Sequence, residues 1–231
     1  MRADFYIFHL FEINVILNRD CRAEKEMCIK EKEEIGMSRI FYLMGKSASG
    51  KDSVYRELMK QLPLENIIMY TTRPMRDWEK NGVQYYFTDE AEYRRLLEDG
   101  KVIESRCYET THGPWIYYTV DDGRIRREGQ VHYLVIGTLE SYEKMKLCFG
   151  EDMLVPIYLQ VDDGLRLERA LNRERSQNLP DYSEMCRRYL ADEDDFSEEN
   201  LRKAGITRRF SNQEMDRCVR EVSEYIRKNM K

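Results

Sequence analysis

Short apolar runs alternate with amphipathic segments along most of the chain. Runs of almost unbroken apolar residues predict strands at 40–44, 66–70, 131–136, 153–161 and 206–210. Apolar residues three or four positions apart predict helices at 51–61, 138–149, 164–177, 181–195 and 212–228. Because strands covered on both faces are apolar throughout, this alternation predicts an α/β fold with a parallel sheet flanked by helices.

Two segments depart from this alternation. Residues 71–129 are rich in tyrosine, arginine and acidic residues and contain one short predicted helix at 89–99, which indicates an inserted mixed α+β subdomain. Residues 1–36 combine an apolar stretch with a mixed-charge run, and Met37 begins a separate pattern. We therefore expect 1–36 to be an N-terminal extension outside the native domain, the alternative being a helix packed on the core, and 37–231 to be the domain.

Composition narrows the possible partners and compartments. The 231 residues include 38 basic and 43 acidic ones, a net charge of -5 that is well interleaved, so no basic surface for nucleic acid is expected. The apolar stretch at 5–17 is short and contains His9 and Glu12, which argues against a membrane span or a signal peptide. Six scattered cysteines without a CxxC pair, and three scattered histidines, argue against a disulfide framework or a zinc site and favour the cytoplasm.

A glycine-rich motif between the first predicted strand and helix is the strongest chemical signal. It matches G-x-x-x-x-G-K and reads Gly45, Lys46, Ser47, Ala48, Ser49, Gly50 and Lys51, followed by Asp52 and Ser53. Glycines let successive amides point inward, and the following helix N-terminus adds positive potential. Lys51 would reach the outer phosphates of a nucleotide, so the motif predicts a nucleotide site. A glycine-rich turn without a ligand is the alternative interpretation.

Asp52 stands where this motif ordinarily has the serine or threonine that ligates magnesium. A carboxylate is a hard oxygen donor, so Asp52 is the predicted Mg²⁺ ligand, with Ser53 as a substitute if the loop register shifts. An acidic residue favoured by the helix dipole is the competing explanation.

The next segment carries a family resemblance. Thr71, Thr72, Arg73, Arg76, Glu79, Gly82 and Tyr85 stand in a T-T-R-x-x-R-x-x-E-x-x-G-x-x-Y spacing. Together with the glycine-rich motif, this spacing resembles the guanylate kinase family of nucleoside monophosphate kinases over most of residues 39–230. The resemblance implies that Arg73, Arg76 and Tyr85 bind the acceptor phosphate and that Glu79 supports them. Guanidinium groups suit this role because they bind phosphate oxygens bidentately.

The resemblance also implies a base site, and here the chain departs from the family. Glu104, in Val102-Ile103-Glu104, corresponds to the glutamate that reads the guanine edge, and Tyr118 and Thr119 to the tyrosine and small hydroxyl that follow, with His112-Gly113 as a competing alignment. The family's serine before the threonines falls on Met69, and its D-I-D acid on Gly137. These departures concern guanine specificity, and with Asp52 they suggest that a carboxylate near magnesium has moved from a strand to the loop.

A lid and a donor-base contact complete the resemblance. Arg169 and Arg173 lie four apart on one predicted helix, with Arg175 near them, and Arg187 and Arg188 on the next. In the family such arginines meet the transferring phosphoryl group. Asn212 resembles the asparagine near the donor adenine, and it is also a candidate N-cap of the last helix.

These features predict a P-loop NTPase fold with core segments 37–70, 130–168 and 189–231, a monophosphate-binding insertion at 71–129 and a helical lid at 169–188. The implied reaction is magnesium-dependent transfer of a phosphoryl group from ATP to GMP, in purine nucleotide metabolism, with Lys51, Arg73, Arg169, Arg173 and Arg188 as catalytic residues. Two alternatives stay open: a kinase for another phosphorylated acceptor, such as a different nucleotide or a sugar phosphate, and a non-catalytic binding module. The sequence does not predict an oligomeric state.

Overall fold

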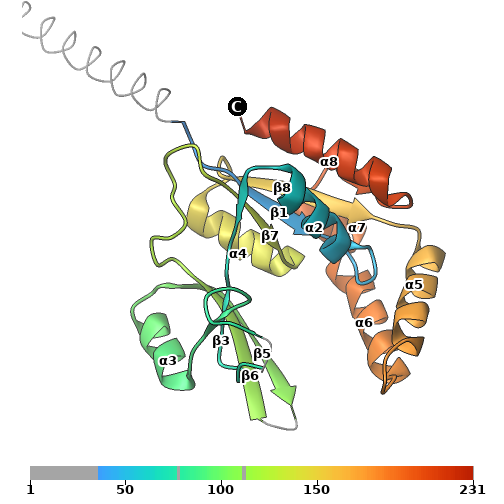
Figure 1. The fold of residues 1–231 in the computed structure, drawn as a ribbon, viewed down its shortest axis with the longest axis horizontal. Helices are drawn as coiled ribbons and strands as arrows, with labels where there is room; N and C mark the ends of the chain where they lie inside the picture. The colour runs from blue at the N-terminus through green and yellow to red at the C-terminus, as the bar shows by residue number, and fades with distance from the viewer. Residues whose placement is uncertain (1–35, 77–78, 111–112, 231) are drawn as a thin grey trace, which may run out of the picture.

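A five-stranded parallel sheet forms the centre of the molecule (Figure 1). The computed structural model describes residues 36–76, 79–110 and 113–230. The strand order is β2-β7-β1-β8-β9, and the strands are β1 (Ile40–Met44), β2 (Leu64–Asn66), β7 (His132–Ile136), β8 (Leu154–Gln160) and β9 (Arg209–Ser211). All four neighbouring pairs are parallel, so the predicted α/β fold is confirmed.

The alternation of side chains along β1 divides the core into two layers. Phe41 and Leu43 face the helices α2 (Lys51–Gln61) and α8 (Met215–Asn229), while Tyr42 faces α4 (Leu139–Phe149) and the short helix α7 (Glu198–Lys203). Burying each large apolar side chain here contributes about 1.5–3 kcal/mol. Because both faces of β1 are covered, all five of its residues are buried, which explains its continuous apolar sequence.

Two features of the core differ from the predictions. The strand expected at 66–70 is absent, since β2 ends at Asn66 and Tyr70 belongs to a different sheet. The residues between them cross from the core to the insertion, and Ile67 is buried on the way. Helix α7 was not predicted, because its six residues are too few to show a helical period.

The segment that interrupts the alternation forms a second sheet. Its order is β4-β3-β6-β5, with β3 (Tyr70–Thr71), β4 (Tyr86–Phe87), β5 (Val102–Thr110) and β6 (Gly113–Val120). Helix α3 (Glu90–Glu98) packs on it around Leu96, Tyr118 and Val120, and Asp89 caps the helix by accepting from the Glu92 amide. The insertion therefore has a small core of its own.

A helical hairpin follows β8 and extends away from the central sheet (Figure 1). It consists of α5 (Asp163–Arg175) and α6 (Tyr182–Asp195). The carboxylate of buried Glu174 accepts from Gln177 Nε2 at 2.8 Å and from the Asp181 amide at 2.6 Å, which fixes the connecting turn. The predicted lid, residues 169–188, covers the end of α5, this turn and the first half of α6.

Most of the N-terminal segment 1–36, including His9, lies outside the described residues. Within the part of the chain that the structure describes, none of the helices combines the length and apolarity needed to cross a bilayer.

Candidate nucleotide site

The glycine-rich loop follows β1 directly and leads into α2. Its backbone is left-handed at Ala48 and Gly50, with φ values of 60° and 86°. A Cβ atom at Gly45 would lie 2.6 Å from the Leu159 carbonyl oxygen, and one at Gly50 would lie 2.5 Å from Asn212 Nδ2. Both positions therefore require glycine, because the loop closely approaches β8 and the segment after β9.

Lys51 is held beneath the loop. Its Nζ donates to the Gly45 carbonyl at 2.7 Å and to the Lys46 carbonyl at 3.0 Å. Burial lowers the pKa of Lys51, and the positive charges of Arg166 and Arg173 act in the same direction, against Asp192 and Asp52. The loop thus positions an ammonium group close to a lid arginine.

An acidic pair on α6 contacts the other side of the loop. Asp192 Oδ2 accepts from the Ser47 amide at 2.6 Å, and Glu193 Oε2 accepts from Lys46 Nζ at 2.5 Å. The Ser47 amide is one of the loop amides that would donate to a bound phosphate. The Asp192 carboxylate therefore takes the place of a phosphate oxygen at this amide. The loop and α6 are held together by charge-assisted hydrogen bonds.

Arg166 on α5 extends this network. Its side chain is 1% exposed; Nε donates to the Ser47 carbonyl at 3.2 Å, and Nη1 donates to Asp163 and Glu193. Its Nη2 lies 3.6 Å from Asp192 Oδ2 and is buried without a hydrogen bond. Arg166 was not among the predicted site residues, because an isolated arginine on a helix normally faces solvent.

Asn212 is tied to the loop, and its backbone to the lid. Its Nδ2 donates to the Ser49 carbonyl at 2.7 Å, and its own carbonyl accepts from Arg169 Nη1 at 3.0 Å. The alternative prediction that Asn212 caps the last helix is wrong, because α8 begins at Met215 and its N-cap is Glu214.

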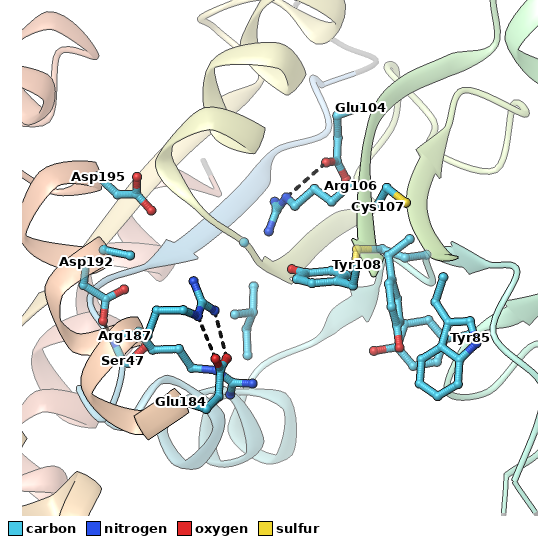
Figure 2. A pocket seen from close by; sticks show the side chains of 17 residues that line it. Ser47, Tyr85, Glu104, Arg106, Cys107, Tyr108, Glu184, Arg187, Asp192 and Asp195 are labelled. Atoms are coloured by element: carbon cyan, nitrogen blue, oxygen red, sulfur yellow. Dashed lines mark hydrogen bonds and ion pairs between the residues drawn. The ribbon is translucent and has the colours of Figure 1, made fainter. Parts of the chain in front are cut away.

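A cavity of about 1020 Å³ opens beside the loop, between α6 and the β5–β6 hairpin (Figure 2). Its lining includes Ser47 from the phosphate loop, Arg187 and Arg188 from α6, and Tyr85 and Glu104 from the insertion. The structure therefore brings the predicted loop, lid and monophosphate-binding segments to one cavity.

Arg73 and Glu79 form a buried ion pair near this cavity. Arg73 Nη2 and Glu79 Oε1 are 2.6 Å apart, and the side chains are 4% and 2% exposed. Glu79 Oε2 also accepts from the Arg76 amide at 2.8 Å, whereas the Arg76 side chain is exposed. The hydrogen bond from Arg73 is the main reason why the pKa of Glu79 is lowered. Glu79 thus contacts Arg73 and Arg76, two of the three residues that it was predicted to support.

Two tyrosines pack against Arg73, and only one of them was predicted. The Arg73 guanidinium lies 5.7 Å from the Tyr85 ring centre, and its Nε donates to the Tyr117 hydroxyl at 3.1 Å. Tyr117 and Tyr85 both line the cavity. Tyr118, which was predicted to bind the monophosphate, is instead fully buried and meets Thr88, because neighbouring strand residues point to opposite faces. The tyrosine on the cavity side is therefore Tyr117.

Glu104 and Thr119, two residues predicted for the base site, contact each other. Thr119 Oγ1 donates to Glu104 Oε1 at 2.8 Å across the β5–β6 pair, and both residues are buried. Arg106, two residues further along β5, has its Nε 3.7 Å from Glu104 Oε2 (Figure 2). Arg106 was not selected from the sequence, although its spacing from Glu104 places it on the same face of the strand. His112, from the competing alignment, lies outside the described residues.

Both departures from the family pattern lie in this cavity. Met69 and Gly137 line it, so neither position offers a polar side chain there. A Cβ atom at Gly137 would be 1.7 Å from the Tyr42 hydroxyl, which therefore occupies the space that a side chain at this position would need. Tyr42 comes from β1, a strand whose sequence gave no sign of a role in the site.

The predicted lid arginines lie on both α5 and α6 and contact different groups. Arg187 and Arg188 both donate to Glu184, which lowers the pKa of that carboxyl to about 2. Arg173 and Arg175 are exposed on α5. In this conformation the predicted lid residues are not gathered around one point.

Asp52 is exposed on the first turn of α2, and Ser53 is half-buried beside it. The described residues contain no group of three or more His, Cys, Asp or Glu that could hold a metal ion by themselves. A magnesium ion commonly takes one or two carboxylates and completes its coordination with substrate phosphates and water, which the exposed Asp52 carboxylate fits.

The N-terminal part of the domain is similar to known sequences. The guanylate kinase family model matches residues 37–117. The chain is 28% identical over 125 residues to guanylate kinase of Thermotoga maritima, covering 53% of this chain and 48% of the relative. It is 40% identical over 67 residues to that of Thermobifida fusca, covering 29% and 34%. The aligned parts thus span about half or less of these two curated relatives.

A longer match extends into the C-terminal half, and the fold comparison covers most of the chain. Guanylate kinase of Legionella pneumophila is 25% identical over 140 residues, or 60% of this chain and 65% of the relative. The crystal structure of guanylate kinase from Anaplasma phagocytophilum superposes with a TM-score of 0.59 at 18% identity, covering 84% of this chain and 87% of that one. At this identity the structural match establishes the fold.

Proposed function

We propose that this chain, which belongs to the guanylate kinase family, transfers the γ-phosphoryl group of ATP to GMP and releases ADP and GDP. One observation carries the proposal: a single cavity is lined by the phosphate loop, by lid arginines and by the insertion that carries Tyr85 and Glu104. A kinase that transfers a phosphoryl group between two bound nucleotides needs the phosphate loop, the lid arginines and the insertion around one cavity. A binding module for a single ligand does not.

The residues present match the demands of phosphoryl transfer. An oxygen of the acceptor phosphate forms a bond to the γ-phosphorus of ATP as the bond to the β,γ-bridging oxygen breaks. This reaction depends on positioning and on stabilising charge at the phosphoryl oxygens, with no covalent enzyme intermediate. Lys51 supplies one cation from below the loop, and Arg169, Arg173 and Arg188 supply others from the lid.

On the acceptor side, the Arg73–Glu79 pair and the two tyrosines form a prearranged group. Three Arg73 nitrogens already donate to Glu79, Tyr117 and the Pro74 carbonyl, which fixes the guanidinium plane. We propose that its remaining N–H groups, the exposed Arg76 side chain and the Tyr85 hydroxyl bind the acceptor phosphate.

Magnesium belongs to the proposal as the ion that accompanies ATP, and Asp52 is the residue that would hold it. When bound, the ion would neutralise charge on the donor phosphates. Replacing Asp52 with Ala, which removes the oxygen donor, is expected to weaken Mg²⁺ affinity, measured by titrating Mn²⁺ into the protein–ATP complex and following free Mn²⁺ by electron paramagnetic resonance. Unchanged affinity would contradict this role and favour a helix-dipole role for Asp52.

A second candidate is a kinase for a different phosphorylated acceptor. It is favoured by Met69 and Gly137, which leave the base pocket without the polar groups of the family pattern. A cytoplasmic location is also part of the proposal, supported by the thiols of Cys148, Cys186 and Cys218 among the described residues.

The test supplies the full chain with Mg-ATP and a panel of acceptors: GMP, AMP, CMP, UMP and two sugar phosphates. Chromatography of ADP and of the phosphorylated product identifies the acceptor, and the Lys51→Ala variant controls for contaminating kinases. GMP turnover above all others supports the main proposal, and preference for another acceptor supports the second candidate. Absence of turnover with every acceptor would contradict both and favour a binding module.

A further inference from the structure

The base end of the cavity contains one negative and one positive side chain within reach of each other. Glu104 is held by Thr119 through Oε1, while its Oε2 lies 3.7 Å from Arg106 Nε, beyond hydrogen-bond length. None of the hydrogen bonds among the described residues uses the Arg106 guanidinium, although its side chain is only 29% exposed. Arg106 therefore brings donors that no described residue accepts from to a carboxylate oxygen, Oε2, that accepts no hydrogen bond from the described residues.

The surroundings leave few other polar groups to contact a base. Met69 is apolar, Gly137 has no side chain, and the Tyr42 hydroxyl beside it lies near Ser141. Figure 2 shows Arg106 reaching from β5 beside Glu104, with Asp195 on the facing wall. Glu104 and Arg106 thus dominate the polar chemistry of this end of the cavity.

The two side chains match two adjacent edges of guanine. Guanine presents N1–H and an exocyclic amine as donors, which suit a carboxylate, and O6 and N7 as acceptors, which suit the planar fork of arginine. Adenine would place its N1 lone pair against the Glu104 carboxylate and its amine against Arg106. A Glu–Arg pair therefore selects guanine without the acid and serine that the family pattern supplies.

We propose that Arg106 is a specificity-determining residue that binds O6 and N7 of the acceptor guanine, while Glu104 binds N1–H and the amine. This inference rests on the proposed function, because it names how the same site recognises its acceptor. Arg106, on β5, would thus replace the polar contacts to the base that the family pattern places at positions 69 and 137.

The experiment compares GMP with two analogues that each lack one contact. In 7-deaza-GMP the N7 acceptor is absent, and in IMP the exocyclic amine is absent. Equilibrium dialysis without ATP gives affinities, and steady-state kinetics give KM and kcat separately, for the full chain and for Arg106→Ala and Arg106→Lys. Arg94→Ala is the matched control, since Arg94 lies on α3 and, within the part of the chain that the structure describes, its ion pair is with exposed Glu90.

A bidentate arginine–guanine contact contributes about 1–3 kcal/mol, so Arg106→Ala is expected to weaken GMP binding about 10–100-fold and raise KM with little change in kcat. The wild type should prefer GMP to 7-deaza-GMP, and the preference should vanish in Arg106→Ala. Discrimination against IMP, which depends on Glu104, should persist in Arg106→Ala. Arg106→Lys retains the charge without the fork and should keep only part of the preference. Circular dichroism confirms that each variant is folded.

Other outcomes separate this inference from the proposed function. If the wild type turns over GMP and Arg106→Ala binds GMP and 7-deaza-GMP as the wild type does, Arg106 is not the reader and only this inference fails. If the wild type binds GMP in an Arg106-dependent manner without turnover, the proposed activity fails and the inference holds. If the wild type does not bind GMP, both are refuted.

Discussion

The phosphate loop and the base pocket lie at opposite ends of one cavity, and they are built in different ways. The loop consists of consecutive residues between β1 and α2, and its glycines and helix N-terminus define most of its geometry. The base pocket collects single residues from the segment before β3, from β5 and β6, and from the turn after β7. Substitutions can therefore alter the base pocket while the loop keeps its glycines, and this chain departs from the family pattern in the pocket at Met69 and Gly137.

The two regions also differ in how their charges are satisfied. Around the loop, Lys46 and Arg166 are bonded to Asp163 and Glu193, and Asp192 accepts from a loop amide. In the base pocket, Arg106 has an ion pair but no hydrogen bond among the described residues. Phosphates must therefore displace a carboxylate, whereas a base would meet a guanidinium that is ion-paired but makes no hydrogen bond to the described residues.

The largest effect is expected at the loop end. Lys51→Ala removes the cation beneath the loop and should lower kcat about 10²–10³-fold, the usual consequence of losing one group that stabilises developing charge. Steady-state kinetics with Mg-ATP and GMP measure it. Lys60→Ala, which removes an exposed lysine from the same helix, should leave kcat unchanged. Equal activity of the two variants would contradict the assignment of Lys51.

The next effect tests the crowding of the base pocket. Gly137→Ala places a Cβ against the Tyr42 ring and should cost about 1–3 kcal/mol in the free energy of unfolding, as overpacking does. Urea denaturation measures this cost. Tyr42→Val opens the space, so the double variant should be more stable than the sum of the two single changes predicts.

Gly164→Ala, in the first turn of α5, is the control and should change stability by less than about 1 kcal/mol. Additive effects of Gly137→Ala and Tyr42→Val would show that the two residues do not share one space.

A smaller effect is expected from the carboxylate that contacts the loop. Asp192→Asn keeps an acceptor for the Ser47 amide but removes a negative charge that opposes the donor phosphates. The KM for ATP should fall about fivefold, for a repulsion of about 1 kcal/mol between partly screened charges. Asp194→Asn, on an exposed position of the same helix, is the control. A raised KM for ATP in Asp192→Asn would instead indicate that the contact prepares the loop for ATP.

The smallest effect concerns the acid end of the stability profile. Because the pKa of Glu79 is lower in the folded state, chiefly through the hydrogen bond from Arg73, its charged form stabilises the protein above the ordinary pKa of 4.5. This stabilisation is lost as the pH falls from about that value through the lowered pKa of the folded state. Urea midpoints should therefore fall less steeply below pH 4.5 in Glu79→Gln than in the wild type.

Glu90→Gln removes an exposed carboxylate on α3 and should keep the wild-type slope. If Glu79→Gln also keeps that slope, the pairing with Arg73 does not set the acid sensitivity.

Features that depend on neighbouring residues follow from the amino-acid sequence alone. The apolar run of β1 predicted a strand, and the glycine pattern predicted a loop between that strand and a helix; both were found. Local conformation and burial follow from consecutive residues, so strands, helices and the phosphate loop can be read directly. Short elements such as α7 escape this reading because they contain too few residues for a period.

Which side chains meet in the base pocket depends on the tertiary structure. Tyr117 and Tyr118 are neighbours on β6, so their side chains lie on opposite faces of the sheet: Tyr117 lines the cavity and Tyr118 lies in the core of the insertion. The contact between Tyr42 and Gly137 joins residues 95 positions apart, and Asp192 reaches Ser47 across 145. Strand register and helix docking fix such contacts, and both depend on packing across the whole molecule, which no local pattern encodes.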